Sequence, residues 1–211
     1  MTDRRPLASR QTRWAADLTR RLAATSITPN QISIASMGFA ALAGGAFWWA
    51  GDAHWLGRVV LLILGAAFVQ LRLLCNLLDG MVAVEAGRGS PDGKFWNEAP
   101  DRVADMLILV GAGLGVGLPG LGWAAAAFAI LTAYIRELGA SAGLGSDFSG
   151  PMAKPHRMAL ITGAALLSLF EPIWHGQGDV LTLGLWIVVI GAAVTALRRS
   201  VRVIQGLKRL R

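Results

Sequence analysis

Residues 58–80, RVVLLILGAAFVQLRLLCNLLDG, form a long apolar run that ends in polar groups, and this run indicates the fold class. Its residues 58–78 are long enough to cross a bilayer, which takes roughly 17–25 mostly apolar residues in a helix. Of the 211 residues in the chain, 54% are hydrophobic and 16% charged, whereas soluble domains carry about 25% charged residues. The composition therefore predicts an integral membrane protein and excludes an ordinary water-soluble enzyme.

Other apolar runs of similar length lie on both sides of this one. The predicted spans are 33–50, 58–78, 99–117, 120–138, 157–174 and 180–198. Thr28-Pro29-Asn30 is a start signal for the first span, and a Leu-Pro-Gly turn at 118–120 separates the third from the fourth. We expect an all-α integral membrane fold of six spans. Four or five spans are the alternative, because the first and fifth runs are short and rich in glycine and alanine.

Lysine and arginine are concentrated on one side of such a bundle. Six basic residues lie in the first 21 positions and six more from Arg198 onward, and the 80–98 and 139–156 loops add others. Cytoplasmic loops are the ones enriched in these residues. We therefore expect both termini to be cytoplasmic, in a bacterial inner membrane. The net charge of +7 then reflects orientation in the membrane, and no nucleic-acid partner is expected.

The N-terminal segment is amphipathic over residues 9–24. Trp14, Leu18 and Leu22 recur every four residues, with arginines off that stripe. We predict a juxtamembrane helix that lies on the cytoplasmic lipid surface; a solvent-exposed basic helix is the alternative. The expected division of the chain is a basic N-terminus at 1–30, a membrane domain at 31–199 and a basic cytoplasmic tail at 200–211.

Acidic side chains are concentrated between residues 79 and 105, which hold six of the 13 Asp and Glu residues. Asn76 and Asp79 are three residues apart at the end of the second predicted span, so they share a helix face. Asn97, Asp101 and Asp105 follow one another at intervals of four at the start of the third, again on one face. Two helix ends joined by a short loop can bring these faces together. Carboxylates within or beside a span are costly and mark candidate functional sites.

These side chains are hard oxygen ligands, which suit Mg²⁺ or Mn²⁺, and such ions typically bridge phosphate oxygens. A solvated acidic loop is the alternative interpretation. It accounts for Glu85 and Asp92, but poorly for Asp101 and Asp105, which enter an apolar run. The predicted metal ligands are Asn76, Asp79, Asn97, Asp101 and Asp105.

The same stretch resembles the signature of the CDP-alcohol phosphatidyltransferase family, D-x2-D-G-x2-A-R-x8-G-x3-D-x3-D. The matching positions are Asp79, Gly80, Ala83, Gly93 and Asp101. The T-P-N sequence at 28–30 and the six spans also fit the family, and the run from Asp101 to Asp105 resembles its phosphatidylinositol-phosphate synthase branch.

Three positions depart from the signature. Asn76 and Asn97 stand where the family has aspartates, and Val84 stands where it has an arginine. An alternative register makes Asp101 and Asp105 the last two signature aspartates. Asp101 is a site residue in both registers.

The resemblance implies that an alcohol hydroxyl attacks CDP-diacylglycerol and releases CMP. It implies that Asp79 and Asp101 hold metal ions across the diphosphate, with Asn76, Asn97 or Asp105 completing their shells. Asp101 would also be the general base. In the same comparison Gly80 and Ala83 let the nucleotide approach the helix, Arg88 or Arg72 replaces the missing arginine, and the enzyme is a homodimer.

A basic cluster, Lys154 and Arg157 with His156 between them, follows the next cytoplasmic loop. Its cations suit an acceptor phosphate or lipid phosphates, although simple positive-inside anchoring explains them almost as well. Two other function classes stay open. One is a relative that binds CDP-lipid or metal without turnover, because of Asn76, Asn97 and Val84. The other is a small transporter, against which the acids lie at one surface and not at the midplane.

Overall fold

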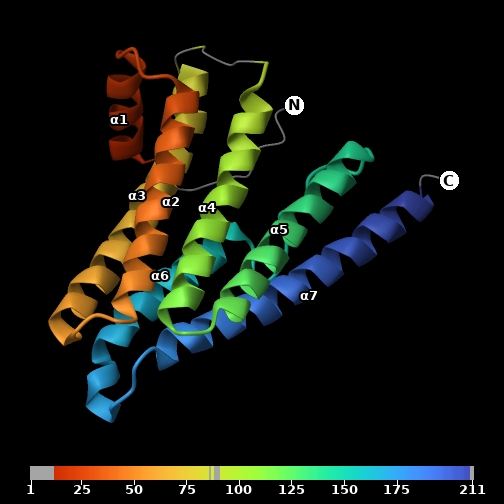
Figure 1. The fold of residues 1–211 in the computed structure, drawn as a ribbon. Coiled ribbons are helices and arrows are strands. Elements are labelled where there is room, and N and C mark those ends of the chain that lie inside the picture. The colour runs from red at the N-terminus through yellow and green to blue at the C-terminus, as the bar shows by residue number, and fades with distance from the viewer. Residues whose placement is uncertain (1–11, 86, 88–90, 210–211) are drawn as a thin grey trace.

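The chain is all-helical in the computed structural model, which describes residues 12–85, 87 and 91–209 (Figure 1). Within those residues there is no strand, and the predicted all-α fold is confirmed. The elements are α1 Arg13–Ala23, α2 Pro29–Ala50, α3 Trp55–Glu85, α4 Gly93–Gly115, α5 Pro119–Ser141, α6 Lys154–Leu167, the 3-10 helix η2 Ser168–Trp174, and α7 Asp179–Arg209.

Five segments are long and apolar enough to cross a membrane: α2, α3, α5, the continuous α6–η2 segment and α7. They are the helices expected of a multi-pass membrane protein. The described residues thus give five such segments, against six predicted spans. The difference is α4, which has 23 residues but carries Lys94, Glu98, Asp101, Arg102 and Asp105 in its first half.

Local signals fix where the helices begin. Thr28 Oγ1 accepts a hydrogen bond from the Gln31 backbone N–H at 3.2 Å, and Gln31 Oε1 accepts one from the Thr28 N–H at 2.9 Å. This capping box, followed by Pro29, starts α2 at the predicted Thr-Pro-Asn sequence. At the opposite end of the bundle, Glu171 accepts hydrogen bonds from the Gly178 and Val180 N–H groups, which satisfies donors at the start of α7.

Helices α2 and α4 pack at backbone contact. A Cβ on Gly111 would lie 2.2 Å from the Gly44 carbonyl oxygen, and a Cβ on Gly115 would lie 2.0 Å from the Phe47 carbonyl oxygen. Small residues allow helix backbones to approach this closely. Helix α2 also packs along α3, so it connects the two helices that carry the predicted metal ligands (Figure 1).

Helix α1 covers the part of residues 9–24 that the structure describes. Leu18 and Leu22 of its apolar stripe pack against Ile32, Leu78 and Val82 of the bundle, whereas Trp14 is exposed. The stripe therefore faces protein along much of its length. Residues 1–11, the first part of the predicted basic N-terminus, lie outside the described residues.

Candidate active site

The end of α3 and the start of α4 meet as the spacing of their polar residues predicted. Asn76 Nδ2 donates a hydrogen bond to Asp101 Oδ1. Two serines of α2 hold the α3 side of this cluster: Ser36 Oγ donates to Asn76 Oδ1 at 2.7 Å, and Ser33 Oγ donates to Asp79 Oδ2 at 2.8 Å. Three helices therefore fix the positions of these side chains.

Asp101 accepts nitrogen donors on both carboxylate oxygens. The Lys154 ammonium contacts Oδ2, while Oδ1 accepts from Asn76 and, at 3.4 Å, from Arg72 Nη2. Lys154 is the first residue of α6. The two clusters that the sequence places in separate loops, one acidic and one basic, thus form a single site at Asp101.

Asp105 lies one helical turn deeper, between two buried arginines. Its Oδ1 accepts from Arg72 Nη2 at 2.8 Å and its Oδ2 from Arg157 Nη2 at 2.6 Å. The spacing of Asp105 grouped it with the metal ligands, but in this geometry both of its oxygens are engaged by guanidinium groups. The arrangement favours a buried ion-pair role for Asp105 and for Arg157.

The other predicted site residues are arranged less closely. Asn97 is exposed, and within the described part of the chain no hydrogen bond connects it to the cluster. Gly80 and Ala83 are partly buried near the end of α3, and Gly93 is the first residue of α4. Arg88 lies outside the described residues, so of the two candidate replacements for the missing arginine only Arg72 is placed, and it lies at the site.

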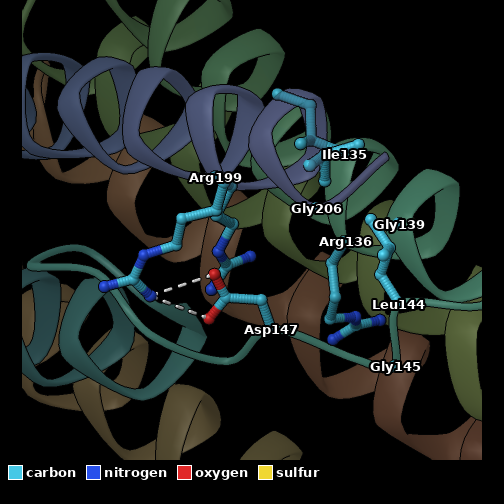
Figure 2. A pocket seen from close by; sticks show the side chains of 10 residues that line it. Ile135, Arg136, Gly139, Leu144, Gly145, Asp147, Arg199 and Gly206 are labelled. Carbon is cyan, nitrogen blue, oxygen red and sulfur yellow. Dashed lines mark hydrogen bonds and ion pairs between the residues drawn. The ribbon is translucent and has the colours of Figure 1, made fainter. Parts of the chain in front are cut away.

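A cavity of about 230 Å³ opens between α5, the following loop and α7 (Figure 2). Its polar lining is Arg136, Asp147, Arg199 and Arg202. The last two lie three residues apart on one face of α7. In the sequence these two arginines belong to the basic C-terminal region, and only their spacing of three residues singles them out.

Arg199 connects this cavity to the acidic cluster. It donates to the Thr132 carbonyl oxygen at 2.7 Å and to the Ser149 carbonyl oxygen at 3.0 Å. The Thr132 hydroxyl in turn accepts from Arg157 Nη1 at 3.4 Å, and Arg157 pairs with Asp105. Arg72 contacts both Asp105 and Asp101. One continuous set of polar contacts therefore runs from the cavity to Asp101.

Asp147 lines the cavity in the loop before α6. Partial burial opposes its ionisation, but hydrogen bonds from Ser149 and the guanidinium of Arg202 outweigh this and hold the pKa of Asp147 below its ordinary value. Its Oδ1 accepts from the Ser149 N–H at 2.8 Å and its Oδ2 lies 3.1 Å from Arg202 Nη1. The cavity thus combines arginine donors with an ionised carboxylate acceptor.

The oxygen donors at the α3–α4 end fit a divalent cation that shares its shell with a substrate. Among the residues that the structure describes, no three His, Cys, Asp or Glu side chains converge as a complete metal cage. The carboxylates of Asp79 and Asp101 and the amide oxygen of Asn76 are the donors present. Mg²⁺ is commonly bound by one or two carboxylates plus substrate phosphates, and this donor set fits that pattern.

No protein-family model matches the chain, but individual proteins do. The phosphatidylinositol phosphate synthase of Streptomyces avermitilis is 29% identical over 202 residues, covering 91% of this chain and 77% of that enzyme. The enzyme of the same name from Mycolicibacterium smegmatis is 27% identical, covering 82% and 76%. The bifunctional IPC transferase and DIPP synthase of Rubrobacter xylanophilus is 36% identical over 115 residues, which cover 53% of this chain and 24% of that protein.

Solved structures share the fold. The crystal structure of Mycobacterium tuberculosis phosphatidylinositol phosphate synthase with CDP-DAG bound matches with a TM-score of 0.75 and 21% identity, over 91% of this chain and 94% of that one. The same synthase in complex with manganese and citrate matches with a TM-score of 0.74 and 20% identity, over 90% and 88% of the two chains. The similarity therefore covers nearly the whole helical bundle.

Proposed function

We propose that this chain transfers the phosphatidyl group of CDP-diacylglycerol to the hydroxyl of a phosphorylated alcohol and releases CMP, with the help of a divalent cation. The observation that carries the proposal is the position of Asp101, in contact with Asn76 and Lys154 and connected by polar contacts to an arginine-lined cavity. The relatives support it, since they are named phosphatidylinositol phosphate synthases, and structures sharing the fold contain CDP-DAG or manganese.

The chemistry follows from these groups. The acceptor hydroxyl oxygen attacks the phosphorus that carries the diacylglycerol, a new P–O bond forms, and the bond to CMP breaks with its electron pair leaving on CMP. The proton of the hydroxyl passes to the Asp101 carboxylate, the general base of the proposal. A divalent cation held by Asp79, Asp101 and the Asn76 amide oxygen would neutralise the diphosphate and stabilise the leaving oxygen. Gly80, Ala83 and Gly93 would leave room for the nucleotide.

The cavity at α7 supports an acceptor that itself carries a phosphate. Arginines bind phosphate through two parallel hydrogen bonds, and Arg199 and Arg202 lie on its wall. Asp147, an acceptor, would receive hydrogen bonds from sugar-like hydroxyls of the same molecule. An inositol phosphate fits both requirements and agrees with the names of the relatives.

The membrane arrangement in this proposal has six spans, with α4 as the sixth. A helix of 23 residues is about 35 Å long at the usual rise, which is enough to cross the hydrocarbon core of a bilayer. In its charged half, α4 turns Asp101 and Asp105 toward the site, and its apolar half completes the crossing. With both termini cytoplasmic, the site lies at the cytoplasmic surface beside α1, and the functional unit is a homodimer.

CMP release by purified protein in nanodiscs tests the proposal. The reaction contains CDP-diacylglycerol, Mn²⁺ or Mg²⁺, and in turn inositol 1-phosphate, inositol, glycerol 3-phosphate and serine. We expect release with inositol 1-phosphate and a loss of about 100-fold or more in Asp101→Ala, as for removal of a general base. The matched control is Glu85→Gln, an exposed carboxylate at the end of α3. Release with unphosphorylated alcohols alone would contradict the assignment of the cavity.

A binding protein without turnover is the second candidate function. It is favoured by the uncharged amides at Asn76 and Asn97 and by the nitrogen donors that already occupy Asp101. Binding of CDP-diacylglycerol without CMP release from any acceptor would support this candidate and refute the transferase.

A further inference from the structure

The site has a surplus of hydrogen-bond donors where a metal site needs acceptors. Across the described residues, its buried side-chain atoms without a hydrogen-bond partner are Arg72 Nε, Arg72 Nη1 and Arg157 Nε, all of them donors. No buried carboxylate oxygen of the site is in that condition. The oxygen donors left for a cation are those of Asp79, Asp101 and Asn76, and this number suits one divalent ion that shares its shell with substrate phosphates.

The charges of the site balance before any metal binds. The site holds three carboxylates, Asp79, Asp101 and Asp105, and three cations, Arg72, Lys154 and Arg157. The cations pair with Asp101 and Asp105, whereas Asp79 accepts hydrogen bonds from Ser33 and from the Gly80 N–H. One divalent cation would then be neutralised by the two ionised phosphates of a CDP-lipid. A second divalent cation would leave two positive charges uncompensated in a largely buried site, which is strongly unfavourable.

Lys154 is held where it can act as a fixed charge. Ala153, the residue before the helix, is buried. Both backbone groups of the preceding residue, Met152, are hydrogen-bonded. Its N–H donates to Thr195 Oγ1 at 3.0 Å, and its carbonyl accepts from Arg157 Nη1 at 2.9 Å. The start of α6 is therefore fixed to α7, and the ammonium reaches Asp101 Oδ2 from an anchored backbone.

We propose that this site binds one divalent cation, between Asp79 and Asp101, and that the Lys154 ammonium supplies the positive charge that a second cation would bring. The inference rests on the proposed function only for the identity of the diphosphate substrate. The number of metal ions per chain can be measured whether or not the protein turns over.

The test is a titration of the metal-free protein with Mn²⁺ in nanodiscs, followed by electron paramagnetic resonance of bound and free ion. We expect one Mn²⁺ per chain, with the hyperfine pattern of an isolated ion. Paired ions, which lie about 3.5–4 Å apart in two-metal sites, would instead give a magnetically coupled spectrum. Two ions per chain, or none, would overturn the proposal.

The role of Lys154 is tested with Asn76→Asp/Lys154→Gln. This double variant adds one negative charge and removes one positive charge, which together equal the charge of one divalent ion. We expect bound Mn²⁺ to double, whereas Asn76→Asp/Lys154→Arg, the matched control, keeps one ion. A count that stays at one in the Gln variant would refute the role of Lys154.

A single variant keeps the test decisive if the double variant does not fold. Lys154→Gln removes a positive charge next to the cation, so the Kd for Mn²⁺ should fall about tenfold or more. An unchanged Kd in this variant would overturn the role of Lys154. A wild-type protein that binds one Mn²⁺ but never releases CMP would refute the proposed function and leave the metal count standing.

Discussion

Arg157 Nη2 lies 2.6 Å from Asp105 Oδ2, and this ion pair joins α6 to α4 beneath the candidate active site. Both side chains are almost fully buried, with 2% and 1% of their surface exposed. Arg72 engages the other oxygen of the same carboxylate from α3. Three helices thus meet at one carboxylate, directly below Asp101.

Removing that carboxylate should destabilise the bundle without removing the metal. In Asp105→Asn two buried guanidiniums lose their counter-charge, and breaking a buried ion pair costs about 3–5 kcal/mol. We expect a clear drop in Tm in detergent and a change of less than tenfold in the Kd for Mn²⁺. Glu85→Gln serves as the exposed control. A loss of Mn²⁺ binding with an unchanged Tm would instead identify Asp105 as a metal ligand.

The close approach of α2 and α4 gives a second prediction. In Gly111→Ala the new Cβ would lie 2.2 Å from a backbone carbonyl of α2, which cannot move aside as a side chain would. Overpacking of this kind costs about 1–3 kcal/mol or more. We expect a lower Tm and also slower CMP release, because Ser33 and Ser36 of α2 hold Asp79 and Asn76.

The control for this prediction lies on α2, the helix that Gly111 packs against. A Cβ on Gly38 of α2 meets nothing within 4 Å, so Gly38→Ala should leave Tm and CMP release unchanged or slightly raise Tm. Equal effects of the two substitutions would show that helix propensity, and not the α2–α4 contact, determines the result.

The part of the site that the sequence predicts is the part governed by helical spacing. Asn76 meets Asp101 because each lies on the polar face of a helix end and a short loop joins the two helices. Ser33 and Ser36 were missed, since single serines in an apolar run carry no signal until the helix that faces them is known. The helix-start signal at Thr28 did predict where α2 begins.

Asp105 shows what helical spacing alone does not predict. It follows Asp101 at an interval of four, so both lie on one face of α4, but a helix also advances along its axis by about 6 Å over four residues. That advance places Asp105 between Arg72 and Arg157, where both of its carboxylate oxygens accept from guanidinium groups. No local sequence pattern predicts that Arg72 of α3 and Arg157 of α6 pair with Asp105.

Arg202 should contribute to binding of the acceptor and little to folding. It is exposed, lines the cavity and contacts Asp147 and Ser149. Loss of a charged hydrogen-bond donor to a phosphate costs about 1.5–3 kcal/mol, so Arg202→Gln should raise the KM for the phosphorylated acceptor by at least about tenfold. The KM for CDP-diacylglycerol should not change, and the fall in Tm should not exceed that of Asp147→Asn, because Asp147 loses only its contact with Arg202 and keeps the one with Ser149.

The neighbouring arginine provides the control for that measurement. Arg198 is exposed and does not line the cavity, so Arg198→Gln should leave both KM values unchanged. If the two variants raised the acceptor KM equally, a general surface potential and not a built phosphate site would be responsible.

Asp147 makes the stability of the cavity loop depend on pH in a defined direction. Partial burial opposes ionisation, but the contacts with Ser149 and Arg202 have the larger combined effect and lower the pKa of Asp147. The folded protein therefore favours the carboxylate form. Its stabilising contribution is complete above the ordinary pKa of about 3.9 and is lost as the pH falls through the lowered value.

Asp147→Asn should therefore have a lower Tm than wild type near neutral pH, and the difference should shrink in acid below about pH 4. Scanning calorimetry across that range measures it, with Asp52→Asn, an exposed aspartate, as the control. A difference that persists unchanged at the acid end would mean that the side-chain shape of Asp147, and not its charge, holds the loop against Arg202.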